Sequence, residues 1–209
     1  MDEWIDVLDA TGVKTGEVRL KSEAHRDGLW HRCFHCWVVY VPQGDEPMLI
    51  LQRRAMEKDT WPGRLDVSVG GHLSAGEDIL DGRREMREEL GLNVEAEDLI
   101  PLGERRAERR IPQGMDREFH GVYLFISGTP PSQMKLQPEE VDSVVLVTFG
   151  DAVLFAGGSE VSATEFSKDG TSSPTNISPD ETVNESEEYF RWAVAGIGGE
   201  LKRIREKPE

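Results

Sequence analysis

Basic residues are scarce in this sequence relative to acidic ones. Lys and Arg together number 24 against 40 Asp and Glu, which gives a formal net charge of −16 over 209 residues. Affinity for nucleic acid is driven largely by cations that neutralise phosphates, so this balance argues against a DNA- or RNA-binding protein. It does not exclude phosphate chemistry, because bound metal ions and a few local arginines can reverse the field at a site. We therefore expect no nucleic-acid partner.

Long hydrophobic runs are also absent. The longest uncharged apolar run, around Cys36–Val41, is far too short to span a bilayer. The first residues, MDEWIDVLD, are acidic and lack the basic-then-apolar order of a signal peptide. Hydrophobic residues make up 37% and charged residues 31%, which is typical of a soluble globular chain. The sequence predicts a cytoplasmic protein without a membrane partner.

Cysteine is limited to two residues, Cys33 and Cys36, within HRCFHC. A CxxC pair can form a redox pair or half of a zinc site. Here the pair opens an apolar, β-branched run that is typical of a strand, and residues i and i+3 of a strand point to opposite faces. The two thiols are not expected to converge on one ion. We interpret both as ordinary strand residues.

The hydrophobic pattern predicts an α/β sandwich, in which strands of a mixed sheet surround a helix. We expect strands at 4–8 and 14–20 as a hairpin, and at 33–41, 48–54, 65–69, 99–104, 118–127 and 143–149, with a polar loop at 22–31 and a helix over 78–90 ended by Gly91. These elements assign residues 1–150 to one domain.

The remaining residues, 151–209, differ in composition. Residues 157–187 are rich in Ser, Thr, Gly, Asp and Glu and poor in large apolar residues, which is typical of a loop or a disordered insertion. Amphipathic character returns in EEYFRWAVAGIGGELKRI, which predicts a helix interrupted near Gly196–Gly199. We expect this part to complete the same domain with a flexible insertion and a C-terminal helix.

Three glutamates gather on one face of the helix predicted over 78–90. Glu85, Glu88 and Glu89 fall within an arc of roughly 100°, because positions i, i+3 and i+4 adjoin on a helix. Carboxylates this close repel one another unless cations offset their charge. Taken alone, the pattern is typical of a solvated acidic face with nearby arginines as counter-charge.

A Gly-Gly pair and a further glutamate before this helix change that interpretation. Gly70 and Gly71 end a predicted strand, permit close backbone approach and expose a carbonyl. Glu77 follows in the opening region of the helix, where its charge favours the positive end of the dipole. Carboxylate, carbonyl and water oxygens are the ligands that Mg²⁺ or Mn²⁺ prefers, with phosphate oxygens of a substrate completing the shell. The segment therefore predicts a divalent-metal site for phosphate chemistry.

The segment GGHLSAGEDILDGRREMREELGL resembles the Nudix box, which reads Gly, five residues, Glu, seven residues, then Arg-Glu-apolar-any-Glu-Glu-any-Gly-apolar. The matching positions are Gly71, Glu77, Arg84, Glu85, Met86, Glu88, Glu89, Gly91 and Leu92. One departure is that only six residues, 78–83, separate Glu77 from Arg84. We place the missing residue at the junction of loop and helix, which leaves the later register intact and puts the role of Glu77 in question.

The resemblance implies roles for these residues. Glu85, Glu88 and Glu89 would hold the divalent ions, Mg²⁺ or Mn²⁺, and one of the three would serve as base for the attacking water. Arg84 would orient them by ion pairing, and the Gly70 carbonyl would be a further ligand. The implied fold is a Nudix-type α/β/α sandwich with a mixed sheet. The implied activity is hydrolysis of a small-molecule diphosphate, such as a nucleoside diphosphate derivative, and homodimers are common in the family.

The resemblance extends over roughly residues 4–150 and is closest to the isopentenyl-diphosphate isomerase branch and its hydrolytic relatives. HRCFHCWVVY, LQRRAMEKDTWPGRLDVSVGGH and MDREFHGVYLF carry it. Isomerases have a metal site of histidines and two carboxylates, to which His31, His72, Asp116 and Glu118 correspond by position, with His25 near a third histidine. Isomerases also need a reactive cysteine where this chain has Gly70, and their box tends to be eroded. Hydrolysis is therefore favoured over isomerisation, and both over a non-catalytic binding protein.

Several residues outside the box have two interpretations. Glu118 lies on a predicted strand and is either an extra metal ligand or base in the site or a surface strand residue, with Asp116 the weaker candidate. His72 either fixes the glycine loop or binds a ligand. His25 and His31 are interpreted as loop residues that cap structure.

Substrate-binding candidates follow the apolar strand at 48–54. By strand alternation either Arg53 or Arg54 faces the cleft, where a guanidinium is positioned to clamp a phosphate through two hydrogen bonds. Trp61 either packs under the loop, which is favoured, or stacks on a base.

Overall fold

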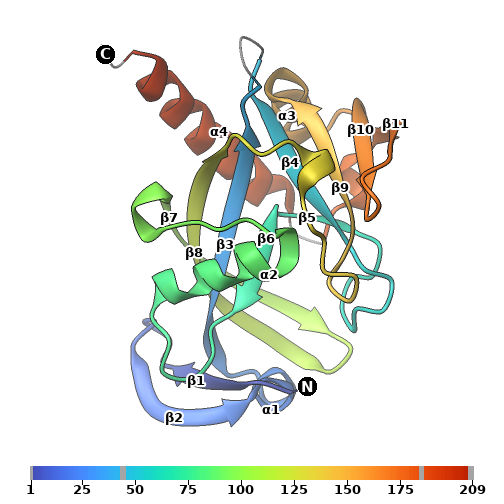
Figure 1. Ribbon diagram of the computed structural model, residues 1–209. Helices are drawn as coiled ribbons and strands as arrows, with labels where there is room; N and C mark the ends of the chain where they lie inside the picture. The colour runs from blue at the N-terminus through green and yellow to red at the C-terminus, as the bar shows by residue number, and fades with distance from the viewer. Residues whose placement is uncertain (1, 43–45, 184–185, 207–209) are drawn as a thin grey trace.

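The computed structural model describes residues 2–42, 46–183 and 186–206 (Figure 1). Its strands form one sheet of eleven, with the order β11-β10-β9-β4-β3-β1-β2 and with β5, β6, β7 and β8 off this path. The strands are β1 (Trp4–Leu8), β2 (Lys14–Leu20), β3 (Trp30–Tyr40), β4 (Met48–Arg54), β5 (Leu65–Asp66), β6 (Val69–His72), β7 (Ile100–Ile111), β8 (Gly114–Ser127), β9 (Val141–Thr148), β10 (Val161–Ser167) and β11 (Ser172–Ile177).

The long strand β3 is the centre of this sheet. It runs parallel to β8, in register from Trp30 opposite Arg117 to Tyr40 opposite Ser127, while the other strand pairs are antiparallel. The sheet is therefore mixed, as predicted. The sequence prediction located β3, β7 and β8, but it ended β7 too early and began β8 too late. The end of β7 and the start of β8 alternate charged residues rather than apolar ones.

Three strands pair with the other edge of β3, and β1 does so only where Leu8 lies opposite Trp30. β4 pairs with residues 38–40 and β6 with residues 33–36, so the sheet divides between them. The Ser68 hydroxyl bridges the division by accepting the Val38 N–H at 2.8 Å and donating to the Ile50 carbonyl at 2.5 Å. β4 and β6 therefore separate along β3, and the Gly-Gly pair lies in β6, next to this separation.

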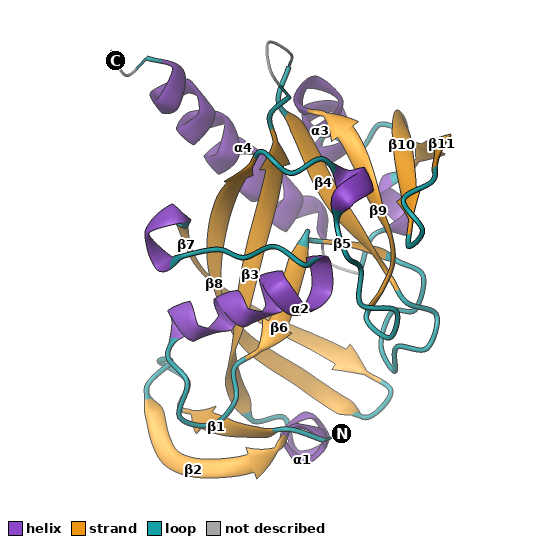
Figure 2. Ribbon diagram, in the orientation of Figure 1, coloured by secondary structure: helices purple, strands orange, loops and turns teal. Residues whose placement is uncertain are grey.

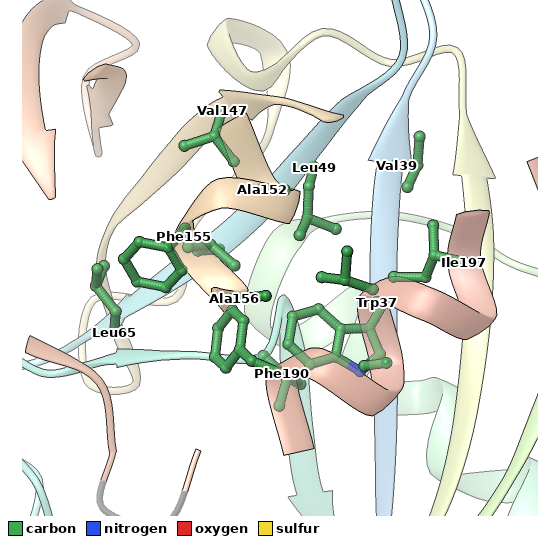
Figure 3. Packing of buried hydrophobic residues seen from close by; sticks show 14 of the residues in the cluster. Trp37, Val39, Leu49, Leu65, Val147, Ala152, Phe155, Ala156, Phe190 and Ile197 are labelled. Atoms are coloured by element: carbon green, nitrogen blue, oxygen red, sulfur yellow. The ribbon is translucent and has the colours of Figure 1, made fainter. Parts of the chain in front are cut away.

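Helices cover both faces of the sheet (Figure 2). They are α1 (Lys21–Asp27), α2 (Arg84–Leu90), α3 (Phe149–Ala156) and α4 (Ser186–Arg205), with short 3₁₀ turns η1 (Ile79–Arg83), η2 (Ala96–Asp98), η3 (Pro131–Gln133) and η4 (Pro179–Glu181). On one face, Phe34 and Val38 of β3 pack with Met86 and Leu90 of α2. On the other, Trp37 of β3 packs with residues of α3 and α4 (Figure 3). The α/β/α layering is thus confirmed.

The helix predicted over 78–90 is shorter than expected. Its first part is the 3₁₀ turn η1, which begins with a capping box between Asp78 and Asp81, and the α-helix begins only at Arg84. Gly82 sits directly against Phe34, where a β-carbon would overlap the ring. This tighter turn lies at the junction of loop and helix, where we place the missing residue of the box, and that placement stays a prediction.

Three other predictions are wrong. The polar loop at 22–31 contains α1, which ends at Gly28 in the left-handed conformation (φ 65) and is followed by the start of β3. Part of the presumed insertion, residues 161–177, forms the hairpin β10–β11, and β10 pairs with β9. Residues 184 and 185 of that segment lie outside the described residues.

The third correction concerns the C-terminal helix. It exists, but α4 runs through Gly196–Gly199 without interruption. A β-carbon at Gly196 would lie 3.6 Å from Leu102 and one at Gly198 would lie 3.4 Å from Phe149, which are ordinary contact distances, so the packing there does not require glycine. No helix in the described part of the chain combines the length and apolarity that crossing a bilayer requires.

Candidate functional site

The three glutamates of α2 are not equivalent. The helix is docked by Met86 and Leu90, which are fully buried. Glu89 is only 3% exposed and Glu85 is half-buried, whereas Glu88 is exposed. Sequence periodicity grouped the three on one face, but packing sets Glu85 and Glu89 apart as the carboxylates that face β6.

The Gly-Gly pair of β6 lies against these two carboxylates. A β-carbon on Gly71 would overlap the Glu85 carboxylate, so glycine is needed for the helix to approach the strand. The backbone N–H of Gly70 donates to Glu89 Oε2 at 3.3 Å. The buried amide of Gln52 on β4 donates to the same oxygen at 2.8 Å. Sequence analysis missed Gln52, because its proximity to Glu89 depends on the division of the sheet.

The protonation of the two carboxylates reflects their burial. Burial raises the pKa of Glu89 to about 8, helped by the negative charge of Glu85. Burial also raises the pKa of Glu85 to about 7, although the Arg84 guanidinium opposes the shift. Two buried carboxylates that are hard to ionise together fit a site for a divalent cation, because a bound cation supplies the missing counter-charge.

Arg84 connects the residues around this pair. Its Nη1 lies 2.5 Å from Glu85 Oε1 and 3.2 Å from Glu88 Oε2, and its Nη2 donates to the His72 carbonyl at 2.9 Å. Its Nε donates to Glu77 Oε1 at 2.9 Å. The six-residue spacing therefore keeps Glu77 within reach of Arg84, as an indirect support for the carboxylates of α2.

A second group of polar side chains converges on the other face of β3. It comprises His25 of α1, His31 and Cys33 of β3, His72 of β6, and Asp116 and Glu118 of β8. The Nε2 atoms of His25 and His31 lie 3.5 and 3.6 Å from Asp116 Oδ1. The Nε2 atoms of His72 and His31 lie 3.5 and 3.8 Å from Glu118 Oε1. We call this group the histidine cluster.

The histidines of this cluster are neutral and ready to act as ligands. Burial lowers the pKa of His25 to about 4 and holds the pKa of His72 well below its ordinary value. His31 is fully buried, and its Nδ1 lies 3.0 Å from the Leu29 carbonyl, which fixes the tautomer with the Nε2 lone pair inward. The Nε2 atoms of all three are buried without a hydrogen-bond partner among the described residues. These orphaned nitrogens fit a bound metal ion.

The structure corrects the interpretation of His25 and His31, and it excludes one of the two interpretations of Glu118. His31 lies within β3 and His25 within α1, so neither is a loop residue that caps structure. Glu118 is 5% exposed and points into the cluster, so it is not a surface strand residue. Its Oε2 is held by Arg109 and, at 2.7 Å, by His120 Nε2. The two cysteines do lie on opposite faces, as predicted, with Cys36 in the core beneath α2.

A cavity next to the histidine cluster is lined by residues that sequence analysis did not single out. His35 stacks on His120 with ring centroids 4.0 Å apart, and its Nδ1 lies 2.9 Å from the Tyr189 hydroxyl. Arg105 lies over the Tyr189 ring, 4.6 Å from its centroid. The sequence does contain a pattern that predicts such a grouping. Polar residues alternate at 31, 33 and 35 and again at 116, 118 and 120, which places each set on one face of a buried strand.

The predicted substrate-binding residues are engaged by the protein itself. Arg53 Nε donates to Glu165 of β10 at 2.8 Å, and Arg54 Nη1 donates to Asp66 of β5 at 2.9 Å. Arg53 thus anchors the hairpin β10–β11 on β4. Trp61 is half-buried and has a left-handed backbone with φ 54. Phosphate binding by the arginines and packing by Trp61 stay predictions.

Comparison with known proteins agrees with this geometry. A family model of the NUDIX domain matches residues 29–166. An uncharacterized Nudix hydrolase of Clostridium acetobutylicum is 36% identical over 154 residues, which are 74% of this chain and 74% of that one. Nudix hydrolase 3 of Arabidopsis thaliana is 37% identical over 153 residues, 71% of this chain but only 19% of that protein. An isopentenyl-diphosphate Delta-isomerase of Clavibacter sepedonicus is 30% identical over 140 residues, 66% of this chain and 70% of that one.

Solved structures agree in fold. The structure of DR0079 from Deinococcus radiodurans has a TM-score of 0.52 and 27% identity, and the match covers 73% of this chain and 87% of that one. The Ap4A hydrolase of C. elegans has a TM-score of 0.51 at 13% identity, covering 80% of this chain and 98% of that one, and shows the fold alone. The predicted Nudix-type fold is confirmed. With the family model matched over most of its length, the chain belongs to the Nudix hydrolase family.

Proposed function

We propose that the protein is a divalent-metal-dependent hydrolase that cleaves a diphosphate linkage in a nucleoside diphosphate derivative or a similar organic diphosphate. The observation that supports this most directly is the pair of carboxylates formed by half-buried Glu85 and buried Glu89, held against Gly70 and Gly71 with their pKa values raised by burial. Nudix hydrolases generally use divalent metals. An oxygen-rich site of this kind suits Mg²⁺ or Mn²⁺.

The residues of α2 divide the work in this proposal. Glu85 and Glu89, with exposed Glu88 and the Gly70 carbonyl, would hold the cation. Once bound, the cation neutralises charge on the diphosphate and lowers the pKa of water. One of the three glutamates accepts the proton of the attacking water, whose oxygen bonds to phosphorus as the bridging P–O bond breaks. Arg84 keeps the carboxylates oriented through its contacts with Glu77, Glu85 and the His72 carbonyl.

A substrate panel tests this proposal. The protein is incubated with Mg²⁺ or Mn²⁺ and a set of nucleoside and prenyl diphosphates, and released phosphate and organic products are identified. The proposal expects metal-dependent cleavage that Glu89→Gln abolishes. Absence of cleavage across the panel, with metal-loaded and folded protein, would contradict it and favour a binding protein. Light scattering on the same samples tests the predicted homodimer.

The histidine cluster supports a second candidate, a diphosphate isomerase. Its histidines and two carboxylates correspond to the metal site that the isomerase branch carries. Gly70 replaces the cysteine that isomerases need, and the box carboxylates are complete, so hydrolysis stays the first proposal. In the panel, an allylic isomer of a prenyl diphosphate without phosphate release would support isomerisation instead.

Gln52 gives a further test of the α2 site. Replacing it with methionine keeps the side-chain length but removes the amide that donates to Glu89 Oε2. We expect kcat to fall by about 10–100-fold, as is typical when a partner that orients a metal ligand is lost. Steady-state kinetics over a range of Mg²⁺ concentrations measures the effect. Gln133→Met, at an exposed amide on η3, is the matched control, and equal rates for the two variants would show that Gln52 does not act through Glu89.

A further inference from the structure

We propose that Cys33 is a metal ligand, and that Cys33, His31, His72 and Glu118 form a four-coordinate site for a thiophilic divalent ion such as zinc. This site is separate from the α2 carboxylates and does not depend on the proposed hydrolase activity. Its four ligand atoms are one thiol sulfur, two imidazole nitrogens and one carboxylate oxygen, all within 4.8 Å of one another.

The distances within this quartet suit tetrahedral coordination. Ligands about 2.0–2.3 Å from a zinc ion at tetrahedral angles lie roughly 3.3–3.8 Å from each other. Glu118 Oε1 lies 3.5 Å from His72 Nε2 and 3.8 Å from His31 Nε2. It lies 3.1 Å from Cys33 Sγ, a closer approach because the thiol donates a hydrogen bond to it. The other pairs of ligand atoms lie within 4.8 Å of each other, so they would have to close by up to about 1 Å to enclose one ion.

The surroundings of the quartet hold the ligands in place. Cys33 opposes His72 across the β3–β6 pairing and His120 across the β3–β8 pairing, so three adjacent strands present the site. Leu29 fixes the tautomer of His31, and His120 together with Arg109 fixes the Glu118 carboxylate through Oε2, leaving Oε1 toward the thiol. Carbonyl and side-chain partners of this kind orient the ligands of metal sites.

The thiol determines which ion is favoured. Thiolate and imidazole ligands favour zinc or cobalt, whereas the oxygen ligands of α2 favour magnesium or manganese. The competing arrangement is a site formed by His25, His31 and Asp116. It shares His31 with the proposed quartet but contains no sulfur ligand. When the ion binds to Cys33, a sulfur–metal bond forms and the thiol proton, now donated to Glu118, leaves to solvent. No redox change is involved.

Cobalt substitution distinguishes these two arrangements. Metal-free full-length protein is titrated with Co²⁺ and followed by ultraviolet and visible absorption. We expect one equivalent to produce a thiolate-to-cobalt charge-transfer band together with the intense visible bands of tetrahedral cobalt, and Zn²⁺ but not excess Mg²⁺ to displace them. Cys33→Ala should lose the charge-transfer band and bind cobalt at least 10-fold more weakly.

The second cysteine provides the matched control. Cys36→Ala removes a thiol of equal burial on the opposite face of the same strand and should keep the full spectrum. Wild-type cobalt protein without a charge-transfer band, or a band that survives in Cys33→Ala, would overturn the proposal. X-ray absorption of the zinc-loaded wild-type protein adds a test without any variant, since it should contain one sulfur neighbour at about 2.3 Å. A shell of nitrogen and oxygen alone would also overturn it.

Discussion

Replacing Glu89 with glutamine is expected to lower kcat/KM for metal-dependent diphosphate hydrolysis by roughly 10²–10⁴-fold, the range typical of losing a positioned acid–base group. The amide keeps the shape of the side chain but cannot accept a proton from water and carries no charge to hold a cation. Glu89 is the most buried carboxylate of α2, so solvent cannot replace it. Steady-state kinetics at saturating Mg²⁺ on the best substrate of the panel measures the loss.

The control for this prediction is Glu97→Gln. Glu97 is an exposed acid on η2, so its replacement removes the same charge from the protein without touching α2. It should leave kcat/KM within about 2-fold of the wild type. A Glu89→Gln variant that retains near wild-type activity would remove Glu89 from the proposed machinery. A variant that loses activity only because it unfolds would be recognised by its unfolding curve.

The box could be predicted from sequence because its information is local. Gly71, Arg84 and the glutamates lie within 19 residues, and helix periodicity fixes how they face one another. Periodicity could not show which of the three glutamates is buried and which is exposed. The difference between buried Glu89 and exposed Glu88 depends on where α2 docks, and docking is decided by Met86 and Leu90 against strands far away in sequence.

The histidine cluster shows the opposite case. Residues 31 and 118 are brought together by the parallel pairing of β3 with β8, across 86 intervening positions, and no local pattern sets that register. Resemblance to the isomerase branch pointed to the matching positions, but His25 and His31 were interpreted as loop residues that cap structure. Cys33 is a second example of what local patterns do not show. Strand alternation correctly separated it from Cys36, yet only the register shows which side chains lie beside it.

The wrong prediction for 157–187 has a different physical cause. Composition indicated too little apolar surface for an independent core, and the hairpin β10–β11 indeed has few buried residues. It is ordered by its neighbours instead. β10 extends the sheet through β9, and Glu165 accepts a hydrogen bond from Arg53 of β4. Composition measures what a segment can bury alone and carries no information about an available sheet edge.

The stability of the metal-free protein should depend on pH through Glu89. Its pKa is raised by burial to about 8, above the unfolded value near 4.5. Such a group contributes most to stability below the unfolded pKa, and the contribution is lost as pH rises through the folded pKa. Comparing wild type with Glu89→Gln removes the contribution of the buried histidines, which act in the opposite direction at acidic pH and are common to both proteins. The difference reports Glu89 together with its repulsion of Glu85, whose pKa burial raises to about 7. The variant should gain stability relative to wild type between about pH 5 and 8, by on the order of a few kcal/mol.

Divalent cations should reduce this difference. A cation that binds the ionised carboxylates stabilises the folded wild type at pH 8, by about 2.7 kcal/mol at a concentration 100 times its Kd. Glu89→Gln should lose most of this gain, because it removes a charged ligand. Urea unfolding from pH 5 to 9, with EDTA or with Mg²⁺, measures both effects on the same two proteins. A difference between them that does not vary with pH would show that Glu89 is ionised without a cation, and an equal response to Mg²⁺ would place the cation elsewhere.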